Sequence, residues 1–158
     1  MSKTTILDAV KIQARAVIPI VKALERELGK ERAFALVGGA IAQDYANRQA
    51  QRIPVRNLHP RDSNTDTVFP VESRVVDDTP TTFAVDMQTC QFAQYFRAIG
   101  EPEIGALLTC GVDFANEALQ RPDWEFRRTR TLMQGADHCD FRWRLRSGRQ
   151  LPGLKQES

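Results

Sequence analysis

The sequence predicts an α+β fold, with an N-terminal helix pair, an antiparallel sheet of about four strands and further helices packed on that sheet. Apolar residues recur at helical spacing in the N-terminal third, whereas two later segments alternate polar and apolar residues. The chain has 158 residues, 42% of them hydrophobic, and is long enough to bury one sizeable core. We therefore expect a single domain over residues 1–150 and a frayed tail over residues 151–158.

The first two helices follow from the spacing of apolar residues and from two helix-breaking residues. In the first helix the apolar positions are Val10, Ala14, Val17, Ile18, Val21, Leu24 and Leu28. Pro19 should kink this helix, and Gly29 should end it. The apolar face of the second helix contains Phe34, Val37, Ile41 and Tyr45. The pair of glycines at 38 and 39 lies inside this helical pattern, where it permits close packing of helices.

Residues 52–66 contain two prolines and many turn formers, so they should form a connection, one that could cover a pocket. His59 lies in this connection, and we interpret it as a solvated loop histidine in preference to a catalytic one. Two strands should follow. Phe69, Val71 and Val75 share one parity, and the second strand turns Phe83, Val85 and Met87 to a single face.

The next segment predicts a short helix, a turn at Gly100 and a longer helix that opens with Pro102 at its first position. On the longer helix, four residues at intervals of three or four should stack on one side: Ala106, Cys110, Asp113 and Glu117. A second stripe on the same helix should face the core: Ile104, Leu107, Gly111 and Ala115. This helix therefore carries a thiol and a carboxylate one turn apart.

The last quarter predicts a β-hairpin. Residues 124–133 are extended in character, residues 134–138 should turn, and residues 139–146 alternate strictly. The alternation places Cys139, Phe141, Trp143 and Leu145 on the inner face, and Asp140 with three arginines on the outer face. Asp140 should thus point away from the core, although at a strand end it could serve the backbone of the turn.

The overall charge and the cysteines exclude several classes of function. A formal charge of +2 demands no anionic partner, and the arginine-rich stretch from Arg121 to Arg149 comes without a nucleic-acid-binding motif. The N-terminus carries charges throughout and has no apolar run that could span a membrane. Three cysteines without a close pair form no disulfide framework, which favours a reduced, cytoplasmic protein. We expect a small-molecule partner, no nucleic acid and no membrane; homo-oligomerisation is left open.

Cys110, Asp113, His138 and Cys139 are the candidate catalytic residues. A nucleophilic thiol needs a lowered pKa or a neighbouring base, and a carboxylate alone would raise the pKa of Cys110. His138 or an arginine would therefore have to assist; the competing interpretation is that the cysteines are core residues. Zinc ligation would require Cys90, Cys110 and Cys139 to converge with His138 or Asp113. Because close ligand pairs such as CxxC are missing, we expect neither metal nor cofactor.

These patterns predict one shared site. Cys110, Asp113 and Cys139 should line a single, mostly apolar pocket, with His138 at its mouth. An unpaired carboxylate is costly beside aromatic walls, so Asp113 should be hydrogen-bonded or have a raised pKa.

Two stretches of the C-terminal half resemble a known family. The first is Cys90…Tyr95…Gly100-Glu101-Pro102-Glu103…Cys110-Gly-Val-Asp113-Phe. The second is Phe126-Arg-Arg-Thr129-Arg-Thr131-Leu-Met-Gln-Gly135-Ala-Asp-His-Cys139-Asp140-Phe141. Both are similar to the L-2-amino-thiazoline-4-carboxylic acid hydrolase family, whose most specific elements here are the Cys110–Asp113 pair and the Thr-x-x-x-Gly-x-x-x-Cys-Asp-Phe run. The helical N-terminal half resembles the family loosely.

The resemblance implies hydrolysis of a carbon–nitrogen or carbon–sulfur bond in a small cyclic amidine, amide or thiazoline-like ring. Water would add to the ring carbon between nitrogen and sulfur, and the ring would open toward an N-carbamoyl amino acid. Such chemistry needs a nucleophile or an activated water, an acid for the leaving atom and a cation for the substrate carboxylate. The resemblance implies catalysis by Cys110, Asp113, His138 and Cys139. It implies substrate binding by Cys90, Tyr95, Arg128, Arg130, Thr131 and Phe141.

The Gly-x-x-x-Cys-x-Phe hairpin also resembles the small-molecule-binding domains named after vinyl reductase, some of which hold zinc through cysteine. This chain has residues 128–131 where those domains carry Glu-x-x-Cys before the glycine, which disfavours the zinc version. A non-catalytic binding module is therefore the alternative to the hydrolase.

Overall fold

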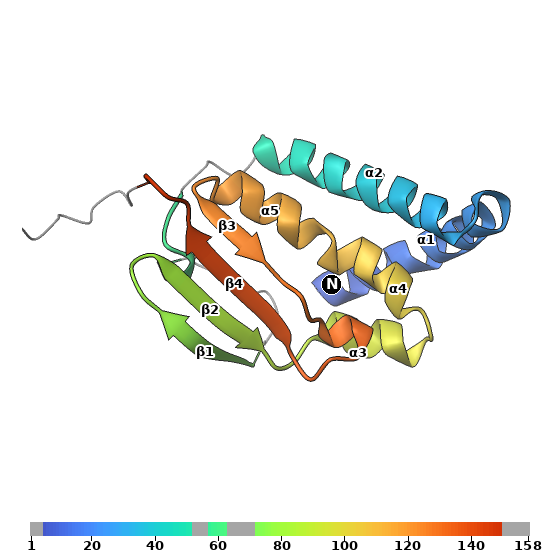
Figure 1. Ribbon diagram of the computed structural model, residues 1–158. Helices are drawn as coiled ribbons and strands as arrows, with labels where there is room; N and C mark the ends of the chain where they lie inside the picture. Colours follow the sequence, from blue (N-terminus) through green and yellow to red (C-terminus); the bar gives the residue numbers. More distant parts are fainter. Residues whose placement is uncertain (1–4, 52–56, 63–71, 150–158) are drawn as a thin grey trace, which may run out of the picture.

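The computed structural model describes residues 5–51, 57–62 and 72–149. The expected tail at 151–158 and the first-strand residues Phe69 and Val71 lie outside these ranges. The fold is α+β, as predicted: an N-terminal helix pair, a four-stranded antiparallel sheet and further helices (Figure 1). Within these ranges, two α-helices precede the first two strands in the chain, and the other α-helices lie between the second and third strands.

Helices α1 (Ile6–Leu28) and α2 (Lys30–Ala50) form the N-terminal pair. A capping box starts α1: the hydroxyl oxygen of Thr5 accepts the N–H of Asp8, and the carboxylate of Asp8 accepts the N–H of Thr5. The helix continues through Pro19 and ends at Gly29, whose φ of 78° suits a residue without a side chain. Gly29 as the end of the first helix is thereby confirmed.

The sheet has the strand order β1-β2-β4-β3, with every neighbouring pair antiparallel. Its strands are β1 (Ser73–Asp78), β2 (Thr82–Met87), β3 (Trp124–Arg127) and β4 (Cys139–Leu145). In the register of the central pair, Phe83 lies opposite Trp143, Val85 opposite Phe141 and Met87 opposite Cys139. The apolar residues of both strands consequently share one face, as their alternation predicted.

The third strand is shorter than expected. The extended segment predicted over residues 124–133 ends as a strand at Arg127, and Leu132–Gln134 form a 3₁₀ turn before Gly135. The cause is a side chain: the Asp140 carboxylate accepts the backbone N–H groups of Thr129 and Arg130, so these groups do not join the ladder. The hairpin therefore closes through a wide connection between residues 128 and 138.

The region between β2 and β3 is helical, with one interruption that the spacing did not predict. Helix α3 (Gln91–Ala98) is followed by α4 (Pro102–Gly105), which Pro102 opens as expected, then by a π-helical turn (Ala106–Cys110) and by α5 (Val112–Gln120). The expected single longer helix is thus divided by the π turn. Helix α5 packs on β3 and against α2, so that α2 lies on the far side of α5 from the sheet (Figure 1).

Two hydrophobic clusters form the core. One joins Ala14, Ala93, Phe96 and Met133 within the helical part. The other joins Phe83, Val85, Trp124 and Trp143 on the helix-covered face of the sheet. Short 3₁₀ turn η1 (Pro60–Asp62) follows His59, whose ring packs edge-on against Phe83 and Trp124. His59 is 6% exposed and hence a buried residue, which corrects the expectation of a solvated loop histidine. Along the described ranges, no helix has the length and apolar character needed to cross a membrane.

Candidate active site at the helix–sheet junction

The π turn ends at Cys110 and determines how this residue is presented. The N–H of Gly111 donates to the carbonyl of Ala106 at 2.8 Å, five residues earlier, and this bond defines the wider turn. Close packing accompanies the turn: a Cβ atom at Gly105 would lie 2.4 Å from Cγ of the buried Phe96. Single π turns occur frequently at functional sites, because the extra residue displaces the helix surface on either side. Cys110 and Asp113 lie directly across this displacement.

Arg128 connects the π turn, helix α5 and the sheet. Its guanidinium donates to the Asp113 carboxylate and, at 3.1 Å, to the backbone carbonyl of Cys110. The same group lies over the ring of Phe114 and over the ring of Phe141, with distances of 5.1 and 5.7 Å to the ring centroids. Only 7% of the Arg128 side chain is exposed. A buried arginine that bonds both a side chain and a backbone carbonyl is therefore the centre of this region.

Asp113 combines a shifted pKa with partial access to solvent. Burial of the carboxyl group raises its pKa to about 6, although the charge and the hydrogen bond of Arg128 act to lower it. The expectation that Asp113 would be hydrogen-bonded or have a raised pKa is confirmed on both counts. The Asp113 side chain is 35% exposed. A carboxyl group with these properties can both accept and release a proton near neutral pH.

The thiols near Arg128 favour the protonated form. Burial raises the pKa of Cys110 to about 11, outweighing the hydrogen bond with Thr109 and the nearby charge of Arg128. Burial also raises the pKa of Cys139, whose sulfur accepts the N–H of Leu132 at 3.2 Å. All three cysteines are free thiols, and Cys90 is near enough to raise the pKa of both others. Within the described ranges, no three residues of the metal-binding types are arranged to hold an ion.

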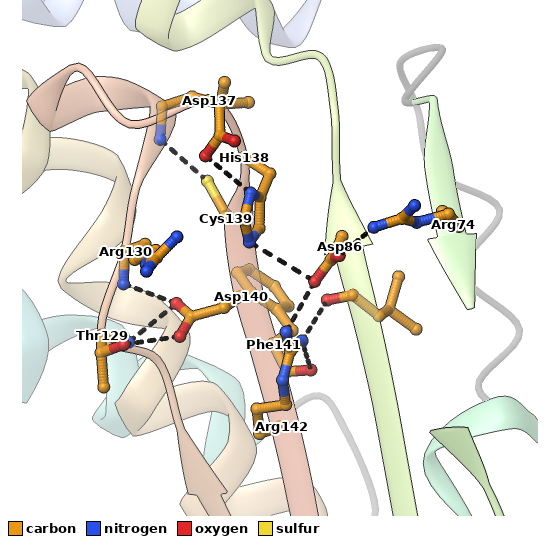
Figure 2. A network of polar contacts seen from close by, with 12 residues as sticks. Arg74, Asp86, Thr129, Arg130, Asp137, His138, Cys139, Asp140, Phe141 and Arg142 are labelled. Carbon is orange, nitrogen blue, oxygen red and sulfur yellow. Dashed lines mark hydrogen bonds and ion pairs between the residues drawn. The ribbon is translucent and has the colours of Figure 1, made fainter. Parts of the chain in front are cut away.

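His138 lies with a different set of residues. Its ring nitrogens are 2.7 Å from the Asp137 carboxylate and 3.6 Å from that of Asp86. Asp86 is paired with Asp140 across β2 and β4, on the polar face of the sheet and thus opposite to Cys139 (Figure 2). The contacts of His138 are therefore with carboxylates of Asp137 and of the polar face of the sheet, because His138 and Asp140 share a strand parity. Its place at the mouth of a pocket around Cys110 and Asp113 stays a prediction.

Asp140 points away from the thiols, and its carboxylate is bonded to the connection after β3. It accepts the N–H of Thr129 at 2.8 Å, the hydroxyl of Thr129 at 2.6 Å and the N–H of Arg130 at 2.5 Å (Figure 2). Burial acts to raise its pKa, yet these hydrogen bonds hold the pKa of Asp140 below its usual value. The side chain serves the backbone of the wide connection, as its position at a strand end allowed.

The remaining candidate residues surround the junction in different ways. The side chain of Cys90 caps the first turn of α3. The ring of Tyr95 packs edge-on against that of Phe96, with 5.0 Å between the ring centroids. Thr131 is buried and caps the 3₁₀ turn through Gln134, which is a structural role. Arg130 is exposed. The structure thus brings Cys110, Asp113, Arg128 and Phe141 into one group and leaves the enclosed pocket expected around them as a prediction.

Two residues beside this group were not among the candidate site residues of the sequence analysis. Phe114 stacks on Arg128 and is 44% exposed, although it directly follows Asp113 in the chain. Asp140 was assigned to the outer face and to the backbone of the turn, but not to the two residues that follow Arg128, which it contacts. For Phe114 the signal was an aromatic residue next to a charged pair. For Asp140 it was an acidic residue at the start of a strand, opposite a threonine in the preceding segment.

The fold and the site define an α+β protein with a carboxyl group of raised pKa, a buried arginine and a thiol at one helix–sheet junction. The family model of the L-2-amino-thiazoline-4-carboxylic acid hydrolases matches residues 9–143, which include every candidate residue. The chain belongs to this hydrolase family. No curated protein is significantly similar to it.

Proposed function

We propose that this protein is a hydrolase that opens a small cyclic amidine, amide or thiazoline-like ring by adding water to the carbon between the two heteroatoms. The observation that carries the proposal is Asp113: its pKa lies near 6, it remains accessible, and it is paired with a buried arginine. General acid–base groups work best when their pKa is close to the working pH. Membership of the hydrolase family supports the same reaction type.

In a thiazoline ring, the Asp113 carboxylate would take one proton from water as the oxygen bonds to the ring carbon. The carbon–nitrogen double bond becomes single, and the ring nitrogen takes a proton from solvent. As the adduct collapses to the carbonyl, its hydroxyl group releases a proton to solvent, the carbon–sulfur bond breaks, the electron pair leaves with sulfur, and Asp113 returns its proton to that sulfur. In net terms one water is consumed, with one hydrogen added to nitrogen and one to sulfur. Arg128 would hold the carboxylate in the orientation needed for both transfers.

Water, and not the Cys110 thiol, is the nucleophile in this scheme. With a pKa of about 11, only about one Cys110 in ten thousand is a thiolate near pH 7. Cys110 and Cys139 instead serve as apolar, polarisable groups beside the ring, in keeping with their burial. For the substrate carboxylate we propose Arg130, because it is exposed whereas the guanidinium of Arg128 is already engaged.

The test is a panel of thiazoline, imidazoline and lactam rings with and without a carboxylate, each incubated with purified protein and analysed by mass spectrometry for the addition of water. We expect turnover of at least one carboxylated ring and its loss by at least about a hundredfold in Asp113→Asn. The matched control is Asp44→Asn, since Asp44 is an exposed carboxylate paired with Arg48 on α2. Thermal unfolding of each variant checks that the fold is retained.

Cys110→Ser separates the two nucleophile schemes. Direct attack by water leaves activity within about tenfold and gives no covalent intermediate, whereas a catalytic thiol would make the protein mass increase by that of a substrate fragment. Tight binding without turnover across the panel would instead identify a ligand-binding module and reject the hydrolase.

A further inference from the structure

The connection that carries Arg128 leaves the sheet at a well-defined point. Strand β3 ends with Arg127 opposite Arg142. If the ladder continued in the same register, Thr129 would lie opposite Asp140. Instead, the Asp140 side chain occupies the hydrogen-bonding position, accepting from the backbone of Thr129 and Arg130 and from the Thr129 hydroxyl (Figure 2). One carboxylate thus replaces the backbone partner of two successive residues.

The two residues held in this way directly follow Arg128, while the Asp140 carboxylate is on the opposite face of the sheet from the Arg128 contacts. We propose that Asp140 is a positioning residue: it fixes the Thr129–Arg130 backbone so that the Arg128 guanidinium lies between Asp113 and the carbonyl of Cys110. The inference rests on the proposed acid–base function of Asp113, and it adds a residue that does not touch the reacting atoms.

Two features of the structure and one general property of arginine support this role. Asp140 is 8% exposed, so its three hydrogen bonds are made in surroundings where an alternative partner from solvent is scarce. All three donors come from two adjacent residues, so the carboxylate fixes both the position and the direction of the backbone. Arginine has several rotatable bonds, and holding its guanidinium in one geometry costs side-chain entropy that a fixed backbone reduces.

The carboxyl group of Asp113 reports on the position of Arg128 without any need for turnover. The titratable groups near it come from several elements: Tyr45 on α2, Cys110 on the π turn, Glu117 on α5, Arg128 after β3 and Cys139 on β4. Arg128 is the cation of this set, and it acts to lower the pKa of Asp113. Displacing the guanidinium should therefore move the Asp113 titration to higher pH.

The experiment is a carbon-13 NMR titration of protein labelled at the aspartate carboxyl carbons, with the Asp113 signal assigned by comparison with Asp113→Asn. Arg128→Met serves as the reference for complete loss of the cation, with an expected upward shift of about one to three pH units. We expect Asp140→Ala to give at least about half of that shift. Asp140→Asn should give much less, because its amide oxygen still accepts backbone N–H groups.

The matched control is Asp86→Ala. Asp86 lies directly opposite Asp140 in the register, is 5% exposed, and is bonded to Arg74 and Arg142 and not to the residues after Arg128. Its loss should reduce stability while leaving the Asp113 midpoint in place. If Asp140→Ala does not fold, Thr129→Val removes one of the three hydrogen bonds at an exposed residue and should produce a smaller upward shift.

An unchanged Asp113 midpoint in Asp140→Ala, or in Thr129→Val when the first variant cannot be studied, overturns the positioning role. An equal shift in Asp86→Ala overturns it as well, because the effect would then be a general consequence of lost stability. Failure of the ring panel with the wild-type protein rejects the proposed function separately and leaves the NMR comparison unaffected.

Discussion

Replacing Arg128 by methionine removes the cation beside Asp113 while keeping most of the buried apolar volume between Phe114 and Phe141. The guanidinium has two roles in the structure, a hydrogen bond with the Asp113 carboxylate and a bond to the Cys110 carbonyl. Methionine retains the contact with the two aromatic rings but provides neither donor. Asp113 then lies in partly desolvated surroundings without its compensating charge, so its pKa should rise.

The expected effect on activity follows from the ionised fraction of Asp113. With a pKa of about 6, roughly nine tenths of the wild-type carboxyl groups are ionised near pH 7. An opposite charge in contact lowers a carboxyl pKa by about one to three units, so its removal should bring Asp113 to about 8. About a tenth would then be ionised near pH 7, which predicts a roughly tenfold lower kcat/KM at that pH.

The assay is the pH profile of kcat/KM for whichever ring the protein hydrolyses, recorded for wild type and Arg128→Met. We expect the acid limb to move upward by about two pH units, with the two profiles converging above about pH 9. A loss that is uniform at every pH would refute the reasoning, because Arg128 would then act on the substrate or on the fold and not through the charge of Asp113.

Three further predictions concern the same residues and their packing. The folded-state pKa of Asp113 is raised from 3.8 to about 6, so its contribution to stability is fully present below pH 3.8 and is lost as pH rises through about 6. The melting temperature of the wild-type protein should therefore fall relative to that of Asp113→Asn between about pH 4 and pH 7. A difference in melting temperature that stays constant over this range would contradict the prediction. Gly105→Ala should lower the free energy of unfolding by about 2 kcal/mol or more in chemical denaturation, since its side chain would meet Phe96 at 2.4 Å, whereas Gly39→Ala, with no atom within 4 Å, should be neutral or stabilising. Alkylation of Cys110 by iodoacetamide, followed by peptide mapping, should accelerate about tenfold per pH unit up to about pH 10; rapid modification near pH 7 would contradict a pKa of about 11.

Much of the fold could be predicted because the signals were local. The alternation from Cys139 to Leu145 corresponds to β4, and Pro102 opens a helix as its fixed φ angle requires. Gly29 adopts the positive φ that ends α1. In each case the residue type and the spacing carry the information within a few positions of the chain.

The features that could not be predicted depend on contacts between distant segments. The end of β3 at Arg127 is set by a carboxylate 13 residues later, and the π turn after Gly105 accompanies close packing against Phe96. The spacing of apolar residues alone does not predict the one additional residue in the π turn. His138 is a different case: extending the parity of β4 by one residue would have placed it with Asp140, on the polar face.

The candidate site was predicted in its residues better than in its chemistry. Cys110 and Asp113 lie together beside Arg128, in agreement with the spacing on the helix and with the need for an arginine. The sequence predicted that the neighbouring carboxylate would raise the pKa of Cys110, but not that burial would be the largest cause, because burial is a property of the whole fold and exceeds the effect of the nearby cation. The structure consequently favours Asp113 over Cys110 as the group that handles protons.

The most direct test of this account is the reaction of the protein with L-2-amino-thiazoline-4-carboxylate in water labelled with a heavy oxygen isotope. The product is analysed by mass spectrometry for one added labelled water and by a thiol reagent for cleavage of the carbon–sulfur bond. The account predicts a ring-opened product with one labelled oxygen and one new thiol, formed by wild type and by Cys110→Ser but not by Asp113→Asn. Full activity in Asp113→Asn, with loss in Cys110→Ser, would contradict it.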